Sequence, residues 1–188
     1  ILLAIYIAVF IWGAINPYDR AVWWVENIPI VAIVVLLVYL YKRGIIFSNL
    51  AYILMAFLPI WHTIGGHYTF ERVPFDWFND LFGYGRNMYD RIGHFSVGFF
   101  AAGFIEYYYQ LKRNMSFGLA AVFAFCVIGT IAGIYEIVEW IYAVKQGGSA
   151  GIAFLGSQGD VWDAQKDMGL DMLGAVFAIV ILWVRERV

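Results

Sequence analysis

The sequence contains little of what soluble and disulfide-stabilised proteins depend on. Only 14% of its 188 residues are charged, and Cys126 is the single cysteine. One cysteine excludes a disulfide and a cysteine-based metal site within one chain. The net charge is only -2, and no basic block is present that could follow a phosphate backbone, so we expect no nucleic-acid partner.

Hydrophobic residues dominate instead. They make up 63% of the chain, against roughly 45–50% in soluble domains. The apolar runs recur along the whole length without a linker or repeat, and a membrane-spanning helix needs about 20 mostly apolar residues. We therefore predict an all-α, polytopic membrane helical bundle, a single domain over residues 1–188 with about six transmembrane helices. The expected spans are Ile1 to Ile15, Trp23 to Tyr41, Ser48 to Ile64, Ile92 to Leu111, Phe117 to Tyr142 and Asp163 to Val184.

Charged residues are distributed unequally between the two ends of the expected bundle. If the six spans alternate in direction, all three histidines and all acidic residues except Glu106 and Glu186 lie at or near one face. Basic residues that directly adjoin helix ends mark the cytoplasmic side. This pattern predicts that both termini lie in the cytoplasm and that the functional residues lie on the extracytoplasmic side of the membrane. The basic residues concerned are Lys42, Arg43, Lys112, Arg113, Arg185 and Arg187.

A row of aspartates begins just before the last expected span. Its members are spaced three, four and four residues apart, so they share one helical stripe. Asp171 lies roughly 16 Å along the helix from Asp160, well below the membrane surface. Each ionised residue inside a membrane costs about 2.5–3.5 kcal/mol, so the row must be neutralised, although Asp160 could simply cap the helix. The four residues are Asp160, Asp163, Asp167 and Asp171.

Three further spans bring ligand-type residues to the same face. The fourth span begins with a cation, a carboxylate and an imidazole at four-residue intervals, and the fifth carries two glutamates one turn apart. Inward-facing carboxylates and imidazoles are how helical bundles build metal sites. The predicted metal ligands are His94, Glu136, Glu139, Asp163 and Asp167. The predicted supporting polar cluster is His62, His67, Arg86, Asp90, Arg91, Asp160 and Asp171.

Simpler roles remain open for several of these residues. Asp90 could form a structural ion pair with Arg86 or Arg91, because buried charges normally find partners. His94 and His67 could be hydrogen-bonded core histidines. Small residues also predict a close contact between the fourth and sixth spans, with Gly98 facing Gly174 and Ala178.

Three functions are compatible with this pattern. The first is an enzyme that uses a divalent metal ion of undefined identity to act on a lipid or another envelope substrate. The second is a carrier for protons or cations, with the buried carboxylates as a relay. The third is a structural or assembly subunit of a membrane complex. Membrane lipids are the expected partners, with a membrane-protein partner or a homo-oligomer as further options, and no catalytic residue is defined.

Three charged strings resemble those of a known family. RNMYDRIGHF, YEIVEW and FLGSQGDVWDAQKDM together resemble the YjdF-type family of uncharacterised bacterial inner-membrane proteins. This resemblance implies an inner-membrane location and supplies no catalytic residues. A more distant similarity is to VanZ-like membrane proteins, which implies association with the cell envelope. The positions that match the VanZ-like pattern are Asp90, His94, Glu136 and Asp167, with Arg91 where those proteins usually have lysine.

Overall fold

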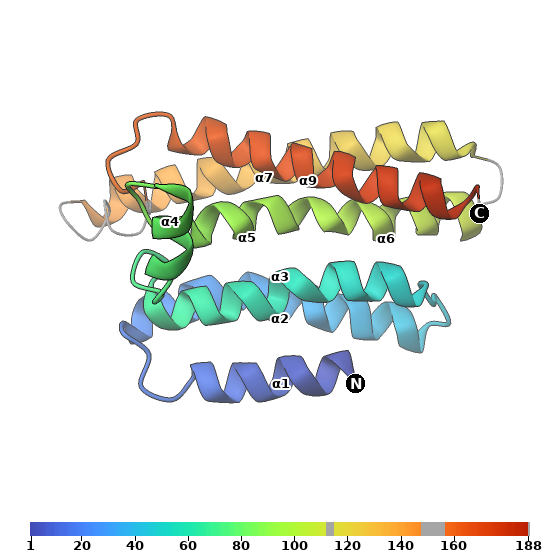
Figure 1. Cartoon of the computed structure of the whole chain (residues 1–188). Coiled ribbons are helices and arrows are strands. Elements are labelled where there is room, and N and C mark those ends of the chain that lie inside the picture. The colour runs from blue at the N-terminus through green and yellow to red at the C-terminus, as the bar shows by residue number, and fades with distance from the viewer. Residues whose placement is uncertain (112–114, 148–156, 188) are drawn as a thin grey trace.

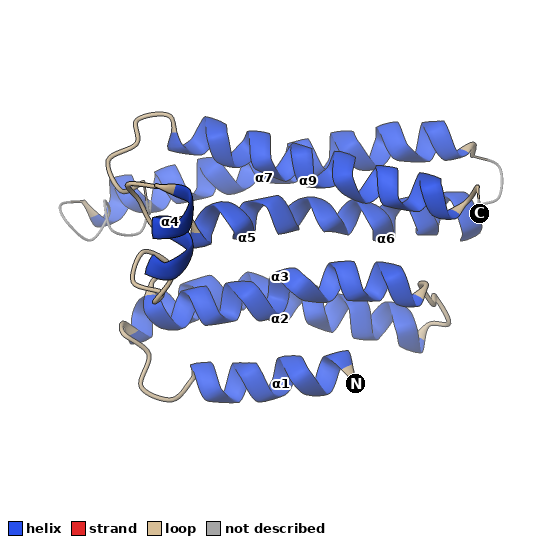
Figure 2. Ribbon diagram, in the orientation of Figure 1, coloured by secondary structure: helices blue, strands red, loops and turns tan. Residues whose placement is uncertain are grey.

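The computed structural model describes residues 1–111, 115–147 and 157–187, and all regular secondary structure in these ranges is helical (Figure 2). The prediction of an all-α fold is therefore confirmed. The basic pair Lys112 and Arg113 lies outside the described residues. The elements are α1 (Leu2–Gly13), α2 (Arg20–Lys42), α3 (Asn49–Tyr68), α4 (Asp76–Phe82), α5 (Tyr89–Val97), the 3-10 helix η1 (Gly98–Phe100), α6 (Ala101–Ile105), the π-helix η2 (Glu106–Leu111), α7 (Phe117–Gln146) and α9 (Asp163–Arg185).

Three helices of the described chain, α2, α7 and α9, are long and apolar enough to cross a membrane. The helix α1 is apolar but has only 12 residues, and the expected fourth span is divided into α5, η1, α6 and η2. The 20-residue α3 is not among the three. The count of about six spans thus stays a prediction.

The helices form two groups that meet along α3 (Figure 1). In the first group, α3 packs closely against α1 and α2. In the second group, α9 packs against α5, α6 and α7. Among the helices of the described chain that pack closely, only α3 joins the two groups, through its contacts with α5, η1 and α6. The helices α2 and α7 are not a closely packed pair in this part of the chain.

The predicted contact between Gly98 and Gly174 is confirmed. A Cβ atom added at Gly98 would overlap the backbone of Gly174 and Ala175, and one added at Gly174 would overlap the carbonyl oxygen of Phe95. Ala178, one turn further along α9, is completely buried. Small residues thus let the two backbones touch, which brings the aspartates of α9 beside His94 on α5.

An ion-pair cluster joins three helices at the other end of the bundle. Glu106 is 2% exposed, and its carboxylate accepts hydrogen bonds from the backbone N–H of Ser48 at 2.7 Å and from Arg185 Nη1 at 2.9 Å. The Ser48 hydroxyl donates to the same carboxylate at 2.5 Å and caps α3 by accepting from the backbone of Ala51. Glu106 therefore fixes the start of α3 to the end of α9.

We expect Glu106→Gln to lower the free energy of unfolding by about 1–3 kcal/mol, because the amide keeps the shape but loses the charge-assisted hydrogen bonds. Thermal unfolding of the purified protein in detergent measures the effect. Glu186→Gln is the matched control, since Glu186 is exposed at the end of the same helix as Arg185. Equal melting temperatures for the two variants would show that the cluster contributes nothing.

Candidate functional site

Basic residues neutralise the outer part of the aspartate row. Asp163 accepts from Arg86 Nη1 at 2.6 Å and from Arg91 Nη2 at 2.5 Å. Asp160 contacts Arg91 Nη2 at 3.2 Å and Lys166 Nζ at 2.6 Å. The hydrogen bond from Lys166 is the main reason that the pKa of Asp160 lies below its ordinary value. Asp163, a predicted metal ligand, is therefore a partner of two arginines.

Arg91 links the outer and inner parts of the row. This side chain is only 5% exposed, and besides Asp160 and Asp163 it forms an ion pair with Asp167, which is 2% exposed. Arg86 reaches Asp90 at 4.0 Å, so the expected pairing of Asp90 with a nearby arginine is present but long. Arginine suits such a site because its planar guanidinium group can donate hydrogen bonds to several carboxylate oxygens at the same time.

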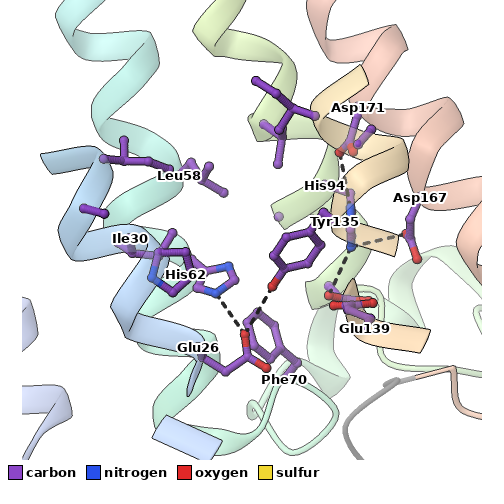
Figure 3. A pocket seen from close by; sticks show the side chains of 18 of the residues that line it. Glu26, Ile30, Leu58, His62, Phe70, His94, Tyr135, Glu139, Asp167 and Asp171 are labelled. Atoms are coloured by element: carbon purple, nitrogen blue, oxygen red, sulfur yellow. Dashed lines mark hydrogen bonds and ion pairs between the residues drawn. The ribbon is translucent and has the colours of Figure 1, made fainter. Parts of the chain in front are cut away.

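The inner part of the row surrounds His94. Its Nδ1 lies 3.2 Å from Asp171 Oδ1, and its Nε2 lies 3.8 Å from one oxygen each of Asp90 and Asp167. Figure 3 shows His94 between Asp171 and Asp167. Asp90, His94 and Asp167 each offer a donor atom, and these atoms lie within 4.8 Å of one another. The four-residue spacings within α5 and within α9 place these groups on facing sides of two helices.

A cavity of about 330 Å³ adjoins these residues and extends between the helix groups. Glu26 from α2 and His62 from α3 line its opposite wall, with Glu26 Oε2 and His62 Nε2 3.1 Å apart. The hydroxyl of Tyr135 on α7 lies 3.5 Å from the same carboxylate oxygen. Glu139 also lines the cavity (Figure 3). Five helices therefore supply ionisable side chains to one pocket.

The other predicted residues lie elsewhere. Glu136 is not part of the cavity lining, and its Oε1 is buried without a hydrogen-bond partner among the described residues. His67 Nδ1 lies 3.0 Å from the carbonyl oxygen of Gly13, and its ring stacks on Trp12 with centroids 4.6 Å apart. His67 thus joins α3 to α1 outside the pocket, in agreement with the structural alternative.

Two pocket residues were missed in the sequence analysis. Glu26 had a usable signal, because a carboxylate six residues inside an apolar helix is as costly as those of α9. Tyr135 had none, since the chain contains 13 tyrosines and nothing in its spacing distinguishes this one. Glu26 would have been found by applying the same cost argument to the second span.

The comparisons with known proteins agree with the resemblance. A family model described as a predicted membrane protein (DUF2238) matches residues 1–187. The inner membrane protein YjdF of Escherichia coli (strain K12) is 33% identical over 180 residues, which cover 93% of this chain and 83% of that protein. No solved structure matches the chain. On the extent of the family match and on this identity, the chain belongs to the DUF2238 family of predicted membrane proteins.

Proposed function

We propose that this protein binds a divalent metal ion between Asp90, His94 and Asp167 and uses it in an enzymatic reaction on a lipid or another envelope substrate. The observation that carries this proposal is the grouping of three donor atoms from two helices within 4.8 Å. Asp171 strengthens it, because a carboxylate on Nδ1 orients an imidazole so that Nε2 is available to a metal ion. By the placement of basic residues, the site belongs to the extracytoplasmic side of a bacterial inner membrane, with both termini in the cytoplasm.

The donor set favours some metals over others. Two carboxylates and one imidazole suit Mn²⁺, Fe²⁺ or Zn²⁺ better than Ca²⁺, which takes six to eight oxygen ligands. Such an ion would polarise a substrate oxygen or activate a water molecule. Glu139 lines the same cavity outside the group of three and is available as a general base.

A purely structural role is supported by one observation, the ion pair between Arg91 and Asp167. If this pair and its neighbours only stabilise the bundle, the site needs no metal. A proton or cation carrier would use the same carboxylates without holding a stoichiometric ion. The metal content of the protein separates the enzymatic proposal from both alternatives.

The test is elemental analysis of protein purified in detergent without chelators. Wild-type protein should contain about one divalent ion per chain. Asp90→Asn should lower this content about tenfold or more, since changing a residue that only hydrogen-bonds to a metal ligand already costs typically 10–100-fold in affinity. Asp90 is the preferred site, because its contacts to Arg86 and His94 are 4.0 and 3.8 Å and its loss should spare the fold. Asp167→Asn should lower the metal content in the same way.

Asp163→Asn is the matched control. It removes a carboxylate from the same face of α9, one turn from Asp167, but this carboxylate binds two arginines. The control should keep its metal and lose only thermal stability. Wild-type protein without a stoichiometric metal would contradict the proposal and favour the structural network or the carrier.

A further inference from the structure

The pocket changes from polar to apolar with depth in the membrane. Along α2, Glu26 is followed by Ile33, about 10 Å deeper at the rise of a helix. Along α3, which runs in the opposite direction, Leu58 lies one turn deeper than His62. Figure 3 shows Leu58 and Ile30 above Glu26, toward the apolar end of the pocket. The helices α5 and α7 repeat the pattern, with Val97 deeper than His94 and Ile131 deeper than Tyr135.

The apolar part of the pocket faces the lipid between α2 and α7. Both helices line the cavity, yet they are not a closely packed pair within the described chain. Ala32 on α2 and Ile131 on α7 line it while being exposed on the surface of the bundle. An exposed apolar rim on a membrane helix contacts acyl chains, so the opening leads sideways into the bilayer.

The polar part of the pocket favours a cationic guest. Apart from the proposed metal ligands Asp90, His94 and Asp167, the lining contains three carboxylates and one histidine, His62, and a negatively charged surface attracts a cation. Glu139 points into the cavity and has no hydrogen-bond or ion-pair partner in the part of the chain that is described. The ring of Tyr135 lies beside it, and aromatic faces bind ammonium groups. These three carboxylates are Glu26, Glu139 and Asp171.

We propose that this pocket binds a single-chain amphiphile with an ammonium head group, which enters from the bilayer between α2 and α7. The head group lies between Glu26 and Glu139, and the chain lies against Ile30 and Leu58. A volume of about 330 Å³ is at the lower end for ligand pockets, roughly 300–1,000 Å³, and suits one head group and the start of one chain. The assignment of this amphiphile as the substrate rests on the proposed function. Its binding in the pocket does not require the metal ion.

Photo-cross-linking in phosphatidylcholine nanodiscs tests the proposal. The probes are an alkylammonium and an alkyl sulfate that carry the same diazirine-labelled chain, and intact-mass and peptide analysis measure the labelling of α2 and α7. We expect the ammonium probe to label these helices at least about tenfold more than the sulfate probe, because pairing with a buried carboxylate is a strong interaction. Glu26→Gln should remove most of this preference, and Glu139→Gln serves if the first variant does not fold.

Variants at the rim test the route of entry. Ala32→Trp should block labelling by the ammonium probe, whereas Val35→Trp should not, since Val35 is exposed on the same helix but does not line the pocket. Equal labelling by the two probes, or preference for the sulfate, would overturn the ammonium head group. Unchanged labelling of Ala32→Trp would overturn the lateral opening. Metal content measured on the same samples reports separately on the group formed by Asp90, His94 and Asp167.

Discussion

Replacing Gly174 by leucine should prevent α9 from docking on α5 and reduce the folded yield to a small fraction of that of the wild type. The first side-chain carbon at this position already overlaps the carbonyl oxygen of Phe95 and approaches the Cα of Gly98 to 3.3 Å. Backbone atoms of two packed helices cannot move aside as a flexible side chain can. The cost should therefore reach or exceed the upper end of overpacking effects, about 3 kcal/mol.

Size-exclusion chromatography in detergent measures the yield of monodisperse protein, and its thermal unfolding measures stability. Gly169→Leu is the matched control, because Gly169 lies on the same helix and a Cβ there would meet nothing within 4 Å. If the two leucine variants fold equally well, the contact between α5 and α9 is not the close backbone contact described above.

The second large effect is expected at Arg91. Arg91→Met keeps much of the side-chain volume but leaves the carboxylates of Asp163 and Asp167 without their shared cation. Removing one partner of a buried ion pair costs about 3–5 kcal/mol, because the remaining charge stays desolvated. Thermal or denaturant unfolding of the purified variant should show a loss of this size.

Arg72→Met provides the comparison at the surface. Arg72 pairs with Glu71 at 2.6 Å, but the two side chains are 44% and 30% exposed, so the loss should be about 0–1 kcal/mol. Adding Asp167→Asn to Arg91→Met should recover part of the stability, since it removes the carboxylate that has lost its arginine, whereas Asp163 keeps Arg86. An Arg91→Met variant as stable as Arg72→Met would mean that water or protons compensate these aspartates.

Much of the site was predictable from the sequence, because its spacing rules act within single helices. Residues four apart in a helix lie on the same face, so the spacing alone places Asp90 beside His94 and Asp167 beside Asp171. Small residues also predicted how the two helices meet, at Gly98. All-helical structure followed from the apolar runs.

Partners on different helices were not predictable in the same way. Asp163 was expected to bind metal, but Arg91 on α5 and Arg86, just before the start of α5, both pair with it. Glu136 and Glu139 share one helix and one turn, yet only Glu139 lines the cavity. Spacing within one helix gives the relative directions of its side chains, whereas the neighbour that each one meets depends on packing between helices.

The joining of the two helix groups through α3 has a mechanical consequence. Since α2 packs closely on α3 but not on α7, a small rotation of α3 against α5 would carry Glu26 toward or away from Glu139. Neither helix group would need to change internally, as in the hinge movements of other proteins. The width of the pocket is then a property of the α3–α5 interface, where the indole N–H of Trp61 donates to the carbonyl oxygen of Tyr89 at 3.0 Å and their rings stack. Trp61 and Tyr89 therefore hold α3 against α5, and a change at either residue should alter the distance between Glu26 and Glu139.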